Sequence, residues 1–122
     1  MKKTLVIALA ALAWSVGASE FIHPMDFKNS EAEKNQVIAY IKQQVRKDYC
    51  EGELDMCDNV TLRMMEAENL SAFKKATQAK DRDIMDKVIS DYCEGDLDMC
   101  NYSTIYMMYQ ENVKAGSQSL EW

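Results

Sequence analysis

A ten-residue segment occurs twice in this chain, and each copy carries two of the four cysteines. Residues 48–57 are DYCEGELDMC and residues 91–100 are DYCEGDLDMC, so nine of the ten positions are identical. The match continues at the same offset, because residues 45–72 align with residues 88–115 without a gap and with 16 identities in 28 positions. Two copies of one supersecondary unit explain this similarity better than chance does. The fold is therefore predicted to be an internal duplication.

Apolar residues on both sides of the repeated segment recur at the spacing of an amphipathic helix. The Ser30-x-x-Glu33 pattern before the first stripe is a capping box, which satisfies free amides where a helix starts. No sustained alternation predicts a strand, and short loops favour antiparallel neighbouring helices. The join at about 70–82 either continues a helix or breaks at Ser71. The sequence thus predicts an all-α domain, a small four-helix domain made of two tandem disulfide-tied helical hairpins. The stripes are Ile38, Ile41, Val45 and Tyr49, then Leu62, Met65 and Asn69, in the first unit, and Ile84, Val88 and Tyr92, then Ile105, Met108 and Asn112, in the second.

In each copy, a glycine and an aspartate stand where one helix would end and the next would start. Gly52 and Gly95 follow the first helix of their unit, where a left-handed residue commonly ends a helix. Asp55 and Asp98 are predicted to cap the next helix. Calcium binding by the loop acids is the alternative, but their spacing does not match a twelve-residue EF-hand loop. We therefore expect structural roles for these residues.

The cysteines are predicted to form the disulfides Cys50–Cys57 and Cys93–Cys100. A chain reversal at the glycine brings each pair together, whereas one straight helix would hold the two residues about 10 Å apart, too far for a bond. Zinc is the alternative, but its close ligand pairs have two to four intervening residues, and here there are six. An even number of cysteines in a small exported chain favours disulfides.

Residues 1–18 have the three parts of a cleaved secretory signal peptide: Lys2 and Lys3, an apolar run, and small residues before the cleavage point. The run is shorter than the ~20 residues that a membrane span needs. Its short basic start favours the periplasm of a Gram-negative bacterium, with secretion as the alternative. Residues 19–122 are expected to form a single α-helical domain, with an N-terminal arm at 19–29, repeat unit 1 at about 31–79, repeat unit 2 at about 81–116, and a tail at 117–122.

The charge of the chain limits the kinds of partner. It has 14 basic and 20 acidic residues, for a net charge of −6, and removal of Lys2 and Lys3 makes the balance more acidic. A strongly acidic domain repels phosphate backbones, so nucleic acid is not an expected partner. Acidity either attracts a basic protein partner or only maintains solubility.

No arrangement of residues indicates catalysis. The single histidine, His23, has no nucleophile in a recognisable pattern with it, and it is assigned to the N-terminal arm. Ser71-x-x-Lys74 lacks the companion motifs of penicillin-binding enzymes, so we interpret it as chance. Phosphate loops, His-Glu-x-x-His and Cys-x-x-Cys are absent from the sequence. The chain is therefore expected to be no enzyme and to need no cofactor.

Methionine is abundant, with nine residues in the chain. Thioethers bind Cu(I), and copper is handled in oxidising compartments. The candidates Met64, Met65, Met107 and Met108 occupy positions shared by both units, which favours a role in the core, where methionine fills irregular gaps. No metal site is expected, and copper binding by these four residues is the weaker alternative.

The two units differ along one face of their second helix, which is mostly polar in the first unit and aromatic in the second. Tyrosine is enriched at protein interfaces, so the aromatic stripe is the candidate for binding a partner. Internal burial is the alternative, since the N-terminal arm and the tail with Trp122 both carry apolar residues that could cover it. The stripe is Tyr102, Tyr106, Tyr109 and Val113, and its counterparts are Asn59, Arg63, Glu66 and Leu70.

These features predict an exported small helical binding protein without catalysis. Its partner is expected to be another protein, in an inhibitor, immunity-type or chaperone-like role. A periplasmic metal or small-ligand binder, with Cu(I) held by methionine, is the alternative, and an enzyme is the least favoured class.

Overall fold

The computed structural model describes residues 20–95 and 97–122, which fold into helices with no strand among them. The predicted all-α class is confirmed. The signal peptide predicted at residues 1–18 lies outside the described residues. The elements are a 3₁₀ turn, η1 (Pro24–Asp26), and the helices α1 (Glu31–Cys50), α2 (Asn59–Ala76), α3 (Arg82–Cys93) and α4 (Tyr102–Gly116).

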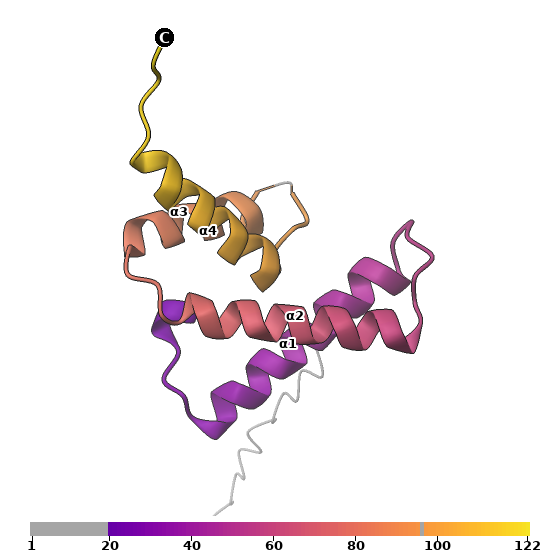
Figure 1. Cartoon of the computed structure of the whole chain (residues 1–122). Helices are drawn as coiled ribbons and strands as arrows, with labels where there is room; N and C mark the ends of the chain where they lie inside the picture. The colour runs from indigo at the N-terminus through magenta and orange to yellow at the C-terminus, as the bar shows by residue number, and fades with distance from the viewer. Residues whose placement is uncertain (1–19, 96) are drawn as a thin grey trace, which may run out of the picture.

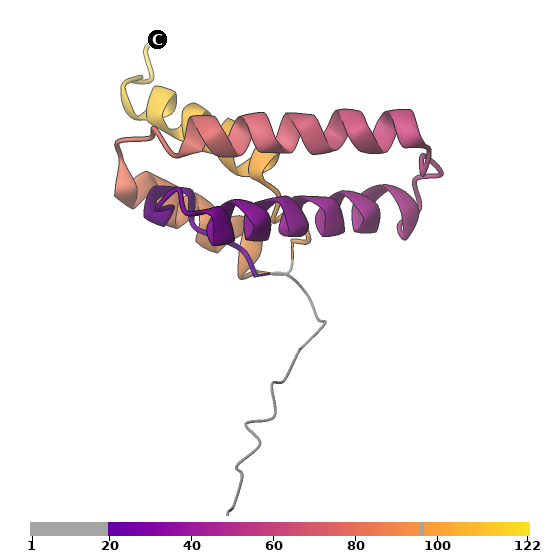
Figure 2. The same ribbon diagram turned by 90° about the horizontal axis from the view of Figure 1, so that it is seen from below.

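The helices form two hairpins of unequal length (Figure 1). α1 and α2 run antiparallel, side by side, and the shorter hairpin of α3 and α4 lies at the end where α2 finishes (Figure 2). α2 packs against both α1 and α4, and α4 also packs against α3. As a result, loop 51–58 lies at the end of the molecule away from the second hairpin (Figures 1 and 2).

Each of the four helices begins with a side-chain cap. Ser30 Oγ accepts a hydrogen bond from Glu33 N, as the capping box predicts. The predicted caps Asp55 and Asp98 are wrong, because the loop continues three residues further in both units and places Asp58 and Asn101 at the cap position. Both of these accept from the amide three residues on, at 2.8 Å. The remaining cap, on α3, is Asp81.

The loop glycines lie close to the preceding helix and do not have a left-handed backbone. No described glycine has a positive φ, so the predicted left-handed stops at Gly52 and Gly95 are wrong. A Cβ on Gly52 would lie 3.3 Å from Asp48 O, and one on Gly95 would lie 3.4 Å from Asp91 O. A side chain at position 52 would press lightly on Asp48 O, and one at position 95 would just touch Asp91 O. At the join between units, α2 runs unbroken through Ser71 to its end.

Both predicted disulfides are present. Cys50 is bonded to Cys57 and Cys93 to Cys100, with a Cα–Cα distance of 4.6 Å in each. That distance lies within the usual range for a bridge. The bridges close two loops of equal length, but Cys57 is exposed whereas Cys100 is half-buried between the two hydrophobic clusters.

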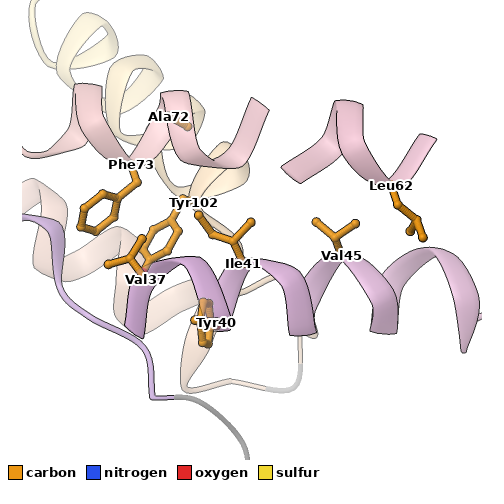
Figure 3. Packing of buried hydrophobic residues seen from close by; sticks show 8 residues of the cluster. All are labelled: Val37, Tyr40, Ile41, Val45, Leu62, Ala72, Phe73 and Tyr102. Atoms are coloured by element: carbon orange, nitrogen blue, oxygen red, sulfur yellow. The ribbon is translucent and has the colours of Figure 1, made fainter. Parts of the chain in front are cut away.

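The larger hydrophobic cluster joins three helices. Side chains from α1 and α2 interdigitate along the first hairpin, and Tyr102 at the start of α4 enters the cluster (Figure 3). The second cluster lies between α3, α4 and the end of α2. The first cluster consists of Val37, Tyr40, Ile41, Val45, Leu62, Ala72, Phe73 and Tyr102, and the second of Ala76, Met85, Val88, Ile89, Ile105 and Tyr109.

The N-terminal arm, residues 20–29, is bound across the helices. Phe21 stacks on the Tyr102 ring at a centroid distance of 5.1 Å, and Phe27 meets Phe73 edge to face. Ile22 N donates to Tyr102 Oη at 3.1 Å, and Tyr102 Oη donates to Ile22 O at 2.9 Å. The arm therefore completes the core of the first cluster.

Candidate interaction surface

The aromatic stripe of the second unit is largely internal. Tyr102 is 1% exposed and Tyr109 is 9% exposed, so neither ring is available on the surface of the folded chain. Burial raises the pKa of Tyr102 well above its usual range. Tyr106 is half-buried and stacks with Tyr109 at 6.4 Å, and Val113 is exposed. Of the four partner-binding candidates, Tyr102 and Tyr109 are corrected to core residues, and Tyr106 and Val113 stay accessible.

The arm is the segment that buries the start of the stripe. Phe21 and Ile22 cover Tyr102, which is one of the two arrangements that internal burial required. The tail does not take part, because Leu120 and Trp122 are fully exposed. The start of the stripe is therefore covered by the chain's own arm, and only Tyr106 and Val113 remain accessible.

The equivalent face of the first unit is open. A furrow of about 250 Å³ lies between α1 and α2, and apolar side chains form its floor. Ile41 is buried there, while Ile38 is 40% exposed and Leu70 is half-buried. We call this the α1–α2 furrow, and it is lined by Ile38, Ile41, Lys42, Arg63, Glu66, Ala67 and Leu70.

The α1–α2 furrow continues toward the N-terminal arm into a wider hollow of about 700 Å³. The two share Ile38 and Leu70, and the hollow adds Phe27 and Phe73 to the apolar floor. Basic side chains stand along both, with Lys42 and Arg63 at the furrow and Lys34 and Lys74 at the hollow. An apolar floor with a basic edge is thus present on a chain whose overall charge is negative.

A second groove, of about 770 Å³, separates α2 from α4. Its floor is polar, because Asn69 Oδ1 accepts from Ser103 N at 3.1 Å. Ser103 Oγ is buried and has no hydrogen-bond partner among the described residues. Tyr49 and Tyr106 line the sides, and burial, with the charge of Asp48, raises the Tyr49 pKa. A polar floor between two tyrosines suits a small polar molecule better than an apolar segment.

The four methionine candidates do not share one environment. Met64 and Met107 are 58% and 53% exposed, so their predicted place in the core is wrong. Met65 and Met108 are half-buried and pack on the first and second cluster, respectively. Met65 and Met107 both line the α2–α4 groove. Among the described residues, no group of three or more His, Cys, Asp or Glu side chains is arranged to hold a metal ion.

His23 has a structural position. Its Nδ1 accepts from Met25 N at 3.1 Å, and its Nε2 lies 2.7 Å from Asp86 Oδ1 on α3. Arg82 holds Asp26 through two hydrogen bonds, and this contact keeps the pKa of the Asp26 carboxyl below its usual value. These contacts attach the arm to α3. They place the imidazole in a network with Asp86 and the Met25 amide, and no nucleophilic side chain of the described residues is bonded to it.

Comparison with models of protein families, with curated proteins and with solved structures finds no match to this chain. Within residues 20–95 and 97–122, no helix is both long and apolar enough to cross a membrane. The function therefore has to be argued from the surface itself.

The sequence predicted the interaction surface on the second unit, where Tyr102 and Tyr109 are buried, whereas the equivalent face of the first unit carries the α1–α2 furrow. The difference between the units at Tyr109 and Glu66 is visible in the repeat alignment, and Glu66 lines the furrow. Ile38 was expected in the core because it lies on the apolar stripe of its helix. Its partial exposure depends on how α2 lies across α1, which the spacing of residues does not specify.

Proposed function

We propose that this chain is an exported, small helical protein that acts by binding another protein and has no catalysis of its own. The observation that carries the proposal is the α1–α2 furrow, where Ile38 and Leu70 stay accessible between basic side chains. Apolar surface of this kind, edged by polar residues, is typical of sites that bind other proteins. Inhibitor, immunity-type and chaperone-like roles all use such a surface.

The cysteine chemistry supports export. Both cysteine pairs are bonded, and disulfides persist in oxidising compartments such as the bacterial periplasm and the extracellular space. Together with the signal-peptide pattern of residues 1–18, this favours the periplasm of a Gram-negative bacterium.

The proposal is tested by photocross-linking in the cells that produce the protein. p-Benzoylphenylalanine replaces Lys42 at the edge of the furrow and, as a control, Lys87 on α3, whose side chain is 72% exposed. Ultraviolet irradiation is expected to link position 42, but not position 87, to another protein, which mass spectrometry identifies. The same cross-linking residue is also placed at Lys74, across the hollow. If neither position 42 nor position 74 yields an adduct, the furrow is not a protein-binding site.

Copper binding is the second candidate, because Met65 and Met107 line the same groove from two helices. Thioether sulfur is a soft ligand that selects Cu(I). Protein purified from copper-fed cells is then expected to contain copper, and Met65→Leu with Met107→Leu is expected to remove it. Elemental analysis that finds no copper in the unchanged protein rejects this function.

A further inference from the structure

The second unit fills the seam between its own two helices with a tyrosine. The Tyr109 ring packs in the second cluster, between α3 and α4. Its hydroxyl accepts hydrogen bonds from Lys80 N at 3.2 Å and Asp81 N at 3.0 Å, at the start of α3. The seam of this unit therefore contains an aromatic side chain of the chain itself, and a hollow of about 490 Å³ remains beside it at the start of α3.

The first unit has a glutamate at the equivalent position. The repeat alignment pairs Glu66 with Tyr109, and Glu66 lies along its own helix, with its carboxylate 3.3 Å from Arg63. The Glu66 side chain, 17% exposed, lines the furrow with its carboxylate turned to Arg63, and Ile38 beside it stays 40% exposed. The α1–α2 furrow is thus the same seam without its aromatic side chain.

A hydroxyl group has no role in the first seam. The donors Lys80 and Asp81 precede the first turn of α3, so their amides are free to bond Tyr109. Their counterparts, Val37 and Ile38, lie inside α1, which begins at Glu31, and interior helix amides bond to carbonyls four residues earlier. A side chain entering this furrow finds apolar contacts and no free amide, so phenylalanine or leucine suits it better than tyrosine.

The charges beside the furrow favour carboxylates on the ligand. Lys42 and Lys74 have no acidic side chain within ion-pair distance in the part of the chain that the structure describes. Both stand at the edge of the apolar floor, from α1 and α2. Opposite charge next to a buried apolar anchor sets the orientation of a partner and rejects segments of the wrong charge.

We propose that the α1–α2 furrow receives one large apolar side chain, phenylalanine by preference, from an acidic segment of the partner protein. This inference rests on the proposed function and specifies what the partner must present. The partner supplies from outside the ring that the second unit takes from its own Tyr109.

The decisive variant closes the furrow in the way that the second unit does. Glu66→Tyr places a ring over Ile38 and Leu70, and Glu68→Tyr is the matched control, because it makes the same change of charge at an exposed position of α2 beside the other groove. The probes are three blocked pentapeptides, Gly-Asp-Phe-Glu-Gly, Gly-Asp-Ala-Glu-Gly and Gly-Lys-Phe-Lys-Gly. Methyl NMR of Ile38 and Leu70 reports binding to the full folded chain.

The acidic phenylalanine peptide is expected to shift the Ile38 and Leu70 methyl signals, with an affinity about tenfold or more above that of the alanine peptide, because only the first buries a ring. The lysine peptide is expected to bind more weakly than the acidic one, and Lys42→Glu with Lys74→Glu is expected to reverse that order. Glu66→Tyr is expected to remove binding, and Glu68→Tyr to leave it unchanged. Equal binding of the phenylalanine and alanine peptides, or full binding by Glu66→Tyr, overturns the inference.

The two proposals fail in different ways. A cross-linked partner that contacts position 42 through a basic or purely polar segment leaves the proposed function standing and overturns the inference. No adduct at the furrow overturns the proposed function, whatever the peptides do. Folding of each variant is checked by circular dichroism, so a loss of binding by an unfolded protein is not counted.

Discussion

Loop 51–58 and loop 94–101 are nearly the same sequence in two different surroundings. The second loop lies on α1, where Tyr40 Oη donates to Cys100 O at 2.6 Å and Lys47 Nζ lies 3.2 Å from Asp98. In the first loop, the equivalent Asp55 and Cys57 are exposed. The positions after the loops differ in the same sense, because Tyr102 is buried where Asn59 is exposed. The second copy is thus packed into the molecule at the loop and at the start of the following helix, whereas the first copy is exposed at both places.

The largest effect is expected at the first residue of α4, compared with the first residue of α2. Tyr102→Ala removes a ring that packs against Phe21 and Phe73, and it is expected to lower the free energy of unfolding by about 3–5 kcal/mol. Asn59→Ala changes the equivalent exposed position and is expected to stay within about 0.5 kcal/mol. Urea unfolding measures both. Similar losses of unfolding free energy in the two variants would show that the buried position of the second copy contributes no more stability than the exposed position of the first.

The disulfides provide a comparison at equal loop length. Because each bridge closes the same number of residues, its effect on the unfolded chain is similar, about 2–3 kcal/mol. Cys93→Ala with Cys100→Ala also disturbs the contacts of Cys100 with both clusters, so it is expected to cost about 1 kcal/mol more than Cys50→Ala with Cys57→Ala. Denaturation midpoints that fall equally in the two variants contradict the difference in packing.

The hydrogen bond from Tyr40 to the second loop gives a smaller effect. Tyr40→Phe leaves Cys100 O without its donor and is expected to cost about 1 kcal/mol of unfolding free energy. Burial, with the charges of Asp48 and Asp98, raises the pKa of Tyr40 to about 12, so the phenol stays protonated at neutral pH. Tyr49→Phe is the control on the same helix, because the Tyr49 hydroxyl makes no hydrogen bond in the described part of the chain. The free energy of unfolding of the Tyr49→Phe variant is expected to be unchanged.

The smallest expected effect is a difference in how the caps of α2 and α4 respond to acid. Hydrogen bonds from Thr61 hold the pKa of the Asp58 carboxyl below its usual value, so the cap stabilises above the unfolded pKa of about 3.9 and is lost as pH falls through the lower folded value. The Asn101 cap on α4 does not titrate. Amide signals of Thr61 are therefore expected to shift between about pH 6 and about pH 2, while those of Thr104 stay nearly constant. Asp58→Asn should make the Thr61 signals equally insensitive to pH.

Helical spacing and the cysteine pattern were sufficient to predict the four helices and both disulfides. The exact start of α2 and α4 was not predictable from local sequence, because Asp55 and Asp58 are both good caps and the choice depends on the closed loop. The glycines do follow the ends of α1 and α3, but the predicted left-handed backbone is absent. The short distance from position 52 to Asp48 O depends on the folded turn, so local sequence could not predict it.

The site residues were harder to predict than the helices. A helical stripe of tyrosines has the same spacing whether it faces a partner or the chain's own arm. The contacts of Phe21 and Ile22 with Tyr102 show that the arm covers its start. The exposure of Met64 and Met107 has a similar origin, because a position shared by both units lies in the core only if both helices present it inward.

The side chain of Asn69 links the two units by a hydrogen bond that the second unit does not repeat. Its amide group donates to Met65 O and its oxygen accepts from Ser103 N, so the first unit caps the last helix of the second. Asn112 repeats the bond to its own helix, to Met108 O, but makes no hydrogen bond to the start of α2 in the described residues. The bond between the two units therefore runs one way: the first unit satisfies a free amide at the start of α4 and receives no equivalent bond at the start of α2 in the described residues.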